Sequence, residues 1–250
     1  MNRDRIISFV DGYLDSKSVK DASQNGLQVE GKAEVKKIVF GVSASLELFR
    51  RAAAAGADMI VVHHGLFWGR SSPVRGPFRK KLETLLYGGI TLAAWHLPLD
   101  KHPVIGNNAQ ILKFLGAGSL KPFGTYNDES IGFKGTFARP RPVSGVMKTL
   151  RDKLSSDIIS ANFGPKKIRT AGVVSGGAAR MFEQAIEAGL DLYITGEVSE
   201  FVQEMARENG ANFIAAGHYN TEKAGVWALE KVLRAKFRVR TEFIDVPNPV

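Results

Sequence analysis

The chain has 250 residues, of which 44% are apolar and 24% charged, and it contains no cysteine. This composition is typical of a globular protein with one large or two small domains, and it excludes disulfides, thiolate zinc sites and cysteine nucleophiles. Any metal must therefore be bound by His, Asp or Glu. No apolar run reaches the roughly 20 residues that span a bilayer, and the N-terminus does not resemble a signal peptide. We expect a cytoplasmic protein without membrane contact.

The chain carries 34 Lys and Arg residues against 25 Asp and Glu residues, a formal net charge of +9. The basic residues occur in scattered pairs and short groups rather than in one patch. This distribution favours a diffuse positive field that attracts a small anionic substrate, such as a nucleotide. Direct nucleic-acid binding is the less favoured alternative, since it usually requires basic residues gathered on one face.

Apolar periodicity predicts that helices and strands alternate through most of the chain. The first half is expected to contain a helix (3–14), a strand (37–43), a helix (46–55), a strand (59–62), a helix (78–87), a strand (90–94), a helix (108–115) and a loop (121–128). The second half is expected to contain a strand (132–138), a helix (143–154), a strand (170–174), a helix (179–188), a strand (192–195), a helix (201–209), a strand (213–216), a helix (222–237) and a strand (239–244). The fold class is therefore α/β.

Near residue 125 the alternation of apolar helices and strands is interrupted by a loop-like segment (121–128). This interruption predicts a boundary between two α/β lobes, each with a mixed sheet flanked by helices. The first lobe comprises residues 1–125 plus 238–250, because the last strand can return to its sheet, and it carries His63, His64 and Asp100. The second lobe comprises residues 126–237 and carries His218 and Glu222.

The two halves also resemble each other. When Asp58 is aligned with Asp191, the segment that precedes His63 and His64 matches the segment that precedes Glu197. The His96 segment then matches the His218 segment, and each of these histidines is followed four residues later by an acid. Two such matches in the same order indicate an internal pseudo-repeat.

Four of the five histidines come directly after a predicted strand: His63, His64, His96 and His218. Ligands of open α/β sheets gather at the carboxyl ends of the strands, so these residues are candidate metal ligands. The adjacent pair points to opposite sides if the strand continues, whereas a turn at Gly65 brings both rings to one side. A pair of this kind can also consist of one ligand and one packing residue.

The acids that follow two of these histidines are Asp100 and Glu222. Three imidazoles and two carboxylates suit zinc, manganese, iron or cobalt, and carboxylates can bridge two ions. We therefore predict two divalent metal ions bound by His63, His64, Asp100, His218 and Glu222. The alternatives are that Asp100 caps backbone amides in a loop fixed by Pro98, and that Glu222 compensates a helix dipole.

Two further residues are candidate catalytic groups. His96 is predicted to orient Asp100 or to carry protons, and Glu197 follows a strand end that faces the same region. Weaker candidates are Asn25 and Gln28, which lie beside a ligand or in a plain turn–strand–turn, and the 175–177 turn, which holds an anion or is simply a tight turn. The 68–77 loop, with Arg70 and Arg75, could close over an anionic substrate.

Four segments together resemble the Nif-three-like family, whose members are often named GTP cyclohydrolase I type 2 homologues. The segments are Asn25–Gly31, Val61–Trp68, His96–Asp100 and Gly217–Glu222. The resemblance extends from the first helix to the last. It implies two α/β lobes facing a cleft with a dinuclear metal centre, with ligands at the five predicted positions. It also implies dimers, often assembled into a toroidal hexamer. The large central insertion of some longer members is absent.

The favoured hypothesis is a metal-dependent hydrolase that acts on a nucleotide or another anionic substrate. A GTP cyclohydrolase I type 2-like reaction needs water to attack a purine ring, which metal-bound hydroxide can do. No segment marks a guanine or triphosphate pocket. The alternatives are a non-catalytic metal-binding or regulatory protein and a ring that binds nucleic acid.

Overall fold

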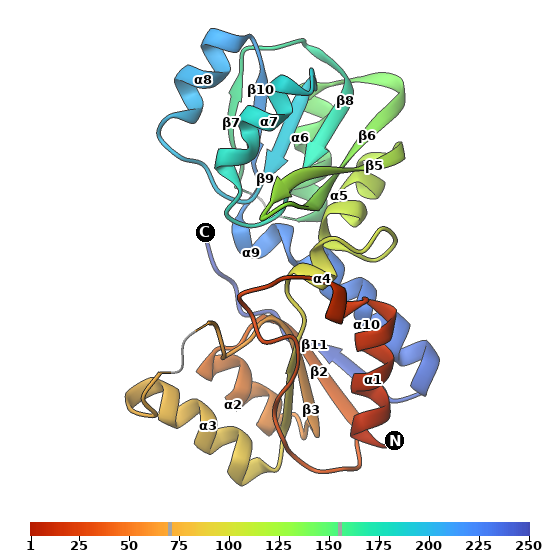
Figure 1. Ribbon diagram of the computed structural model, residues 1–250, viewed down its shortest axis with the longest axis vertical. Coiled ribbons are helices and arrows are strands. Elements are labelled where there is room, and N and C mark those ends of the chain that lie inside the picture. Colours follow the sequence, from red (N-terminus) through yellow and green to blue (C-terminus); the bar gives the residue numbers. More distant parts are fainter. Residues whose placement is uncertain (70–71, 155–156) are drawn as a thin grey trace. The chain divides into compact units, whose positions relative to one another are not determined.

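The computed structural model describes residues 1–69, 72–154 and 157–250. These residues form two compact units, in which unit 1 comprises residues 1–99 and 226–247 and unit 2 comprises residues 100–225 and 248–250 (Figure 1). None of the described helices has the length and apolar character needed to cross a membrane.

Unit 1 is built on a mixed sheet with the strand order β1-β4-β3-β2-β11. Strands β4, β3, β2 and β11 are parallel, and β1 runs antiparallel to β4. The elements are α1 (Arg3–Tyr13), η1 (Ser16–Ser18), β1 (Gly26–Val29), β2 (Lys37–Ser43), α2 (Leu46–Ala54), β3 (Met59–His64), α3 (Gly76–Gly88), β4 (Thr91–Ala94), most of α4 (Leu97–Asp100), most of α10 (Lys223–Phe237) and β11 (Arg240–Phe243). As predicted, the last strand returns to the first sheet.

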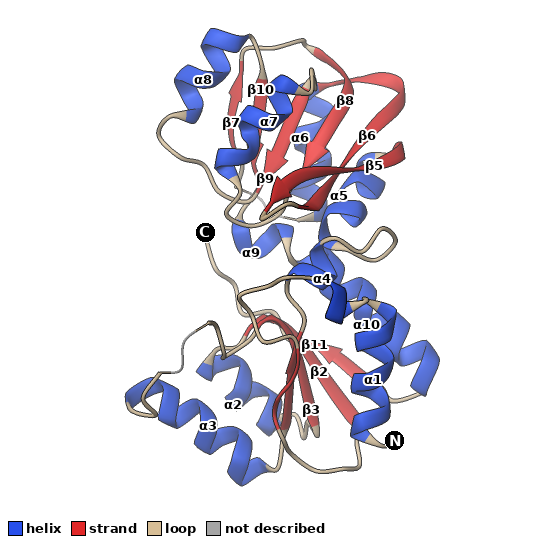
Figure 2. Cartoon of the chain, viewed as in Figure 1, coloured by secondary structure: helices blue, strands red, loops and turns tan. Residues whose placement is uncertain are grey.

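Helices cover both faces of this sheet, α2 and α3 on one face and α1 and α10 on the other (Figure 2). The central strands are therefore buried from both sides, and β3 is apolar from Met59 to Val62. Leu48 and Phe49 of α2 and Leu85 of α3 pack in the core beneath one face. This packing fixes the edge of the sheet where His63 and His64 end β3.

Unit 2 is built on a second mixed sheet, with the order β5-β6-β8-β9-β10-β7. Strands β8, β9 and β10 are parallel, and the other pairings are antiparallel. The elements are α5 (Asn107–Leu115), β5 (Ala117–Tyr126), β6 (Glu129–Pro142), α6 (Val143–Lys153), β7 (Ile159–Asn162), β8 (Lys167–Val173), η2 (Ala179–Met181), α7 (Phe182–Glu187), β9 (Leu192–Thr195), α8 (Val202–Asn209), β10 (Asn212–Ala215) and α9 (His218–Thr221).

The structure divides the chain earlier than the expected boundary near residue 125. Helix α5 belongs to unit 2, because Ile111, Leu112 and Leu115 pack in one core with residues of β6, α6 and β8. The prediction of a loop over 121–128 is wrong, since β5 occupies most of this segment. Its side chains are largely exposed, so its apolar pattern is weak, and pairing with β6 supplies the order.

The internal repeat has a physical counterpart in the two sheets. Each contains three consecutive parallel strands, β2-β3-β4 in unit 1 and β8-β9-β10 in unit 2. Asp58 Oδ2 accepts hydrogen bonds from the backbone N–H groups of Lys36 and Lys37, at 2.8 and 3.0 Å. Asp191 Oδ2 accepts the equivalent two bonds from the backbone N–H groups of Arg169 and Thr170 within β8, at 2.7 and 2.9 Å. The aligned aspartates therefore perform the same structural role.

Candidate metal centre

Three histidines of unit 1 gather at the carboxyl end of its parallel strands. His63 and His64 end β3, and His96 follows the neighbouring strand β4. The ring centroids lie 4.7 Å apart for His63 and His64, 5.0 Å for His63 and His96, and 5.6 Å for His64 and His96. One ring nitrogen from each lies within 4.8 Å of the other two. Of the two predicted arrangements of the adjacent pair, the structure has the one that brings both rings to one side.

Each of these imidazoles is held through its Nδ1 atom. Nδ1 of His63 lies 3.0 Å from the carbonyl oxygen of Trp95, which can only accept, so this nitrogen carries the proton. Nδ1 of His64 lies 3.1 Å from Ser43 Oγ, and Nδ1 of His96 lies 2.9 Å from Asp21 Oδ1. An outer partner on one ring nitrogen is typical of metal-binding histidines, because it orients the ring and directs the lone pair of Nε2 toward the ion.

Unit 2 carries a histidine between two carboxylates. His218 begins α9, and Glu222 follows the last residue of that short helix. His218 Nδ1 lies 2.5 Å from Glu197 Oε1, and its Nε2 lies 3.2 Å from Glu222 Oε1. Burial lowers the pKa of His218, but hydrogen bonds and charge from Glu222 and Glu197 outweigh this effect and raise it to about 9. The ring is thus in an environment that strongly favours a positive charge, as in a cation site.

Asp100 is buried at the end of α4 and is held by side chains that we did not predict. Its Oδ1 accepts hydrogen bonds from Asn107 Nδ2 at 2.8 Å and from Ser175 Oγ at 3.1 Å. Asn108 Nδ2 donates to the backbone oxygen of Asp100, and its Oδ1 accepts from the backbone N–H of Ser175. Two consecutive buried asparagines at a helix start were the available sequence signal. The predicted loop at Pro98 is instead the first turn of α4, where proline is tolerated.

The 175–177 turn lies directly beside the unit 2 ligands. Gly176 has φ +70°, and a Cβ on it would lie 2.5 Å from Glu222 Oε1 and 3.2 Å from His218 Nε2. The absence of a side chain therefore leaves room at the two donor atoms. The amides of Ser175 and Gly176 donate to Asn108 Oδ1 and Thr221 Oγ1, which supports the tight-turn interpretation over an anion site.

The residue types and their surroundings fit a divalent cation. Imidazole and carboxylate donors suit zinc, manganese, iron or cobalt. Two observations support the fit. The Nδ1 atom of each imidazole has a hydrogen-bonding partner, which leaves Nε2 for an ion. Gly176 has no side chain that would fill the space at the donor atoms of His218 and Glu222. His63, His64 and His96 belong to unit 1, and Asp100, His218 and Glu222 to unit 2.

Residues 1–249 match the family described as Duf34/NIF3 (NGG1p interacting factor 3). The chain belongs to the Duf34/NIF3 family. It is 46% identical over 249 residues to a Pyrococcus abyssi protein named GTP cyclohydrolase 1 type 2 homolog, with 99% of each chain covered. An Escherichia coli K12 protein of the same name is 39% identical over 254 residues and is covered completely.

Solved structures of similar proteins have the same fold. Protein ybgI, described as of unknown function, matches with a TM-score of 0.93 and 38% identity, and 100% of each chain is covered. TTHA1606 from Thermus thermophilus has the same TM-score and coverage at 36% identity. These matches confirm the predicted family and the predicted pair of mixed α/β sheets.

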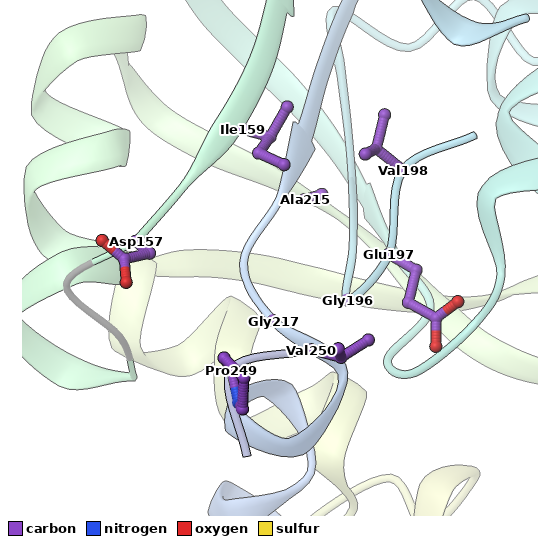
Figure 3. A pocket seen from close by; sticks show the side chains of 9 residues that line it. All are labelled: Asp157, Ile159, Gly196, Glu197, Val198, Ala215, Gly217, Pro249 and Val250. Atoms are coloured by element: carbon purple, nitrogen blue, oxygen red, sulfur yellow. The ribbon is translucent and has the colours of Figure 1, made fainter. Parts of the chain in front are cut away.

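In this Duf34/NIF3 chain, a cavity of about 260 Å³ adjoins the unit 2 ligands. Figure 3 shows the residues that line it: Asp157, Ile159, Gly196, Glu197, Val198, Ala215, Gly217, Pro249 and Val250. The lining is largely apolar, with carboxylates from Asp157 and Glu197. It lies at the carboxyl ends of β9 and β10, where the open-sheet rule places ligands. Of the two expected closing arginines, Arg75 precedes α3 and Arg70 lies outside the described residues.

Proposed function

We propose that this protein binds two divalent metal ions and hydrolyses a nucleotide or another small anionic molecule. The proposed ligands are His63, His64, Asp100, His218 and Glu222. The observation that carries the proposal is that each histidine among them has its Nδ1 hydrogen-bonded to an outer partner. The number of ions rests on the resemblance to the Nif-three-like family and on the ability of Asp100 and Glu222 carboxylates to bridge.

Divalent ions supply two properties when bound: they lower the pKa of water and they polarise the bond that is attacked. The chain's own residues must hold those ions and handle protons. Asn107 and Ser175 fix the direction of the Asp100 carboxylate. Glu197 orients His218 through its Nδ1 and also lines the cavity, so we propose it as the group that exchanges a proton with the substrate.

The cavity restricts how an anionic substrate can bind. Asp157 and Glu197 contribute negative charge to its wall, and Ile159, Val198 and Ala215 contribute apolar surface. Because Glu197 is paired with the His218 ring, it is the apolar part of the wall that favours an uncharged ring over a phosphate in this cavity. We therefore propose that the uncharged part of the substrate occupies the cavity and that its anionic part lies toward the metal ligands. A nucleotide is consistent with the names of the relatives.

The test is metal removal followed by refilling. Protein treated with a chelator and refilled with zinc, manganese, iron or cobalt should gain turnover on a panel of nucleotides and phosphoesters. Asp100→Ala should lose this turnover and part of the bound metal, whereas His102→Ala, which changes a histidine outside both ligand sets, should lose neither. Absence of metal-dependent turnover across the panel would refute the hydrolase. Elemental analysis that finds no metal would refute the whole proposal.

A second candidate is a protein that holds metal without catalysis. It is favoured by the fact that the carboxylates next to the proposed ligands, Asp21 and Glu197, are both hydrogen-bonded to histidine Nδ1 atoms. A carrier needs these bonds for orientation and needs no proton-transfer group. Unchanged properties in Glu197→Gln and His96→Asn, apart from metal affinity, would favour the carrier.

By the same family resemblance we propose a homo-oligomer of dimers arranged as a toroidal hexamer. Analytical ultracentrifugation measures the mass directly, and a monomer at micromolar concentration would refute it.

A further inference from the structure

Strands β5, β6 and β8 of unit 2, which lie side by side (Figure 1), carry a hollow that shares no residue with the proposed metal centre. We propose that this hollow binds the phosphate group of a small molecule. Its volume is about 300 Å³, and its lining combines the 188–190 turn with the side chains of Ser119, Lys121, Lys134, Thr136 and Thr170. The proposal stands independently of the proposed function, because none of these residues is a proposed ligand.

Two lysines face each other across neighbouring strands. Lys121 of β5 is paired directly with Lys134 of the antiparallel strand β6. Side chains of directly opposite residues project from the same face with Cβ atoms about 5 Å apart, and like charges in such a pair destabilise the sheet. Among residues 1–69, 72–154 and 157–250, neither ammonium group has an ion pair or a hydrogen bond. An anion between the two groups would replace this repulsion with attraction.

The usual structural reason for a lysine on a sheet accounts for only one of the pair. Strand β5 is at the edge of the sheet, where lysine commonly prevents pairing with another chain. This explains Lys121. It does not explain Lys134, which is half-buried on β6, a strand with neighbours on both sides.

A bulge in β5 directs its lysine toward the hollow. Gly118 pairs with Thr136. Lys121 pairs with Lys134, three residues further along β5 but only two along β6. In a regular strand, residues three apart point to opposite faces, so the extra residue is what places Lys121 on the face of its partner. Ser119, within the bulge, has φ +53°, a conformation that is unfavourable for a residue with a Cβ. Bulges of this kind recur where a strand must aim a side chain at a site.

Hydroxyl groups complete the donors of the hollow. Thr170 Oγ1 accepts a hydrogen bond from the backbone N–H of Asp191 at 3.0 Å, which leaves the hydroxyl proton available to a ligand. Ser119 and Thr136 are exposed and can donate in the same way. None of the described residues that line the hollow is acidic. The hollow therefore offers positive charge and hydroxyl donors without a competing carboxylate in its wall.

This set of donors fits a phosphate group better than a carboxylate. Two ammonium groups and three hydroxyls exceed what the two oxygens of a carboxylate can accept, whereas phosphate has more acceptor oxygens and is a common ligand of lysine. The volume lies at the lower end of the range for small-molecule sites, and Ala188 and Leu190 provide apolar surface for a short carbon chain. Nucleic acid is less well matched, because it needs cations along a groove that follows many phosphates.

The test is isothermal titration calorimetry of the full chain after metal has been removed by chelation and dialysis, so that phosphate cannot bind through an ion. The probes are inorganic phosphate and glycerol 3-phosphate, with acetate as the carboxylate control. Both phosphate probes should bind and acetate should not. Tighter binding of glycerol 3-phosphate identifies a phosphorylated small molecule as the ligand, and equal binding identifies free phosphate. Lys121→Gln and Lys134→Gln should each weaken binding by about 10-fold or more, because each removes a charged hydrogen-bond donor.

Thermal unfolding supplies a readout that a purely structural lysine would not change. Without phosphate, Lys134→Gln should have an unfolding midpoint equal to or above that of the wild type, because the like-charge pair is gone. Millimolar phosphate should raise the midpoint of the wild type but not that of the variant. Lys113→Gln is the matched control, since Lys113 is an exposed lysine of α5 outside the hollow. It should keep the wild-type affinity within twofold.

Several results would overturn the proposal. These are no binding of either phosphate probe at millimolar concentration, acetate binding as tight as phosphate, or unchanged affinity in both lysine variants. An oligonucleotide that binds more tightly than either probe and depends on Lys134 would replace the small molecule with nucleic acid. If Lys134→Gln does not fold, the exposed Lys121→Gln decides alone. Metal binding by the wild type is measured separately, so either proposal can fail without the other.

Discussion

Replacing Gly176 by alanine places a methyl group beside two of the proposed donors of unit 2, Glu222 and His218. The backbone there has φ +70°, a conformation that costs a residue with a Cβ about 1 kcal/mol. The methyl carbon would lie 2.5 Å from Glu222 Oε1 and 3.2 Å from His218 Nε2. The Glu222 carboxylate is 3% exposed, so it cannot simply swing into solvent. Gly176→Ala must therefore displace a proposed ligand as well as strain the backbone.

Gly189→Ala is the matched control. Its φ is +63°, and a Cβ on Gly189 would meet nothing within 4 Å. Without metal, Gly189→Ala should lose about 1 kcal/mol of stability, which is a few degrees in the unfolding midpoint. Gly176→Ala should lose at least as much, because its methyl group also overlaps the Glu222 carboxylate. Only Gly176→Ala should also lose metal affinity, on the order of 10- to 100-fold. The assays are thermal unfolding in chelator and competition for Zn²⁺ with a chromophoric chelator.

The result that would refute this reasoning is Gly176→Ala with wild-type Zn²⁺ affinity. Equal losses of affinity in both glycine variants would also refute it, because they would trace the effect to backbone strain alone. A normal affinity would mean that Glu222 and His218 do not act as metal donors in this arrangement.

Three further predictions concern single groups. Burial raises the pKa of Asp21, but the hydrogen bond and charge of His96, together with hydrogen bonds from Asn25 and Ser23, outweigh burial and lower the pKa from 3.8 to about 2. Asp21 should therefore contribute about 2 kcal/mol to the free energy of unfolding above pH 4, and this contribution should disappear as the pH falls toward 2. Urea unfolding of the wild type and of Asp21→Asn over this pH range measures the difference. Asp58→Ala and Asp191→Ala should each lower the free energy of unfolding by about 1–3 kcal/mol, because each leaves two backbone N–H groups without their acceptor. Neither substitution should change the metal content. Asn108→Ala should lower the free energy of unfolding, measured in urea, by at least as much. It should also lower Zn²⁺ affinity, because the buried Asn108 amide is hydrogen-bonded to the backbone of Asp100 and of Ser175. An unchanged Zn²⁺ affinity would contradict this link.

The internal repeat underlies the proposed metal centre. Both units present parallel strands whose carboxyl ends carry histidine, and in both an acid holds the Nδ1 atom of the histidine that follows the third strand. The units nevertheless differ in their donors, because His63 and His64 are matched by Gly196 and Glu197. One half of the repeat thus offers mainly imidazoles and the other half mainly carboxylates.

The sequence alone determined the elements that are buried on both faces. β2 and β9 have the predicted bounds, because continuous apolar runs between turn residues leave no other assignment. The sequence also placed the four histidines at strand ends. Strand β5 was missed, since an exposed strand is ordered by its pairing partner rather than by its own pattern.

Only the tertiary structure decided how the donors are held. Asp21 and His96 are 75 residues apart, and Asp100 and Ser175 are also 75 residues apart. No local pattern links such pairs, because their contact depends on how strands and loops pack. The sequence therefore determined which residues are available to bind metal, through residue type and strand position. The packing of each unit decided which of them are oriented to do so, because orientation comes from partners distant along the chain.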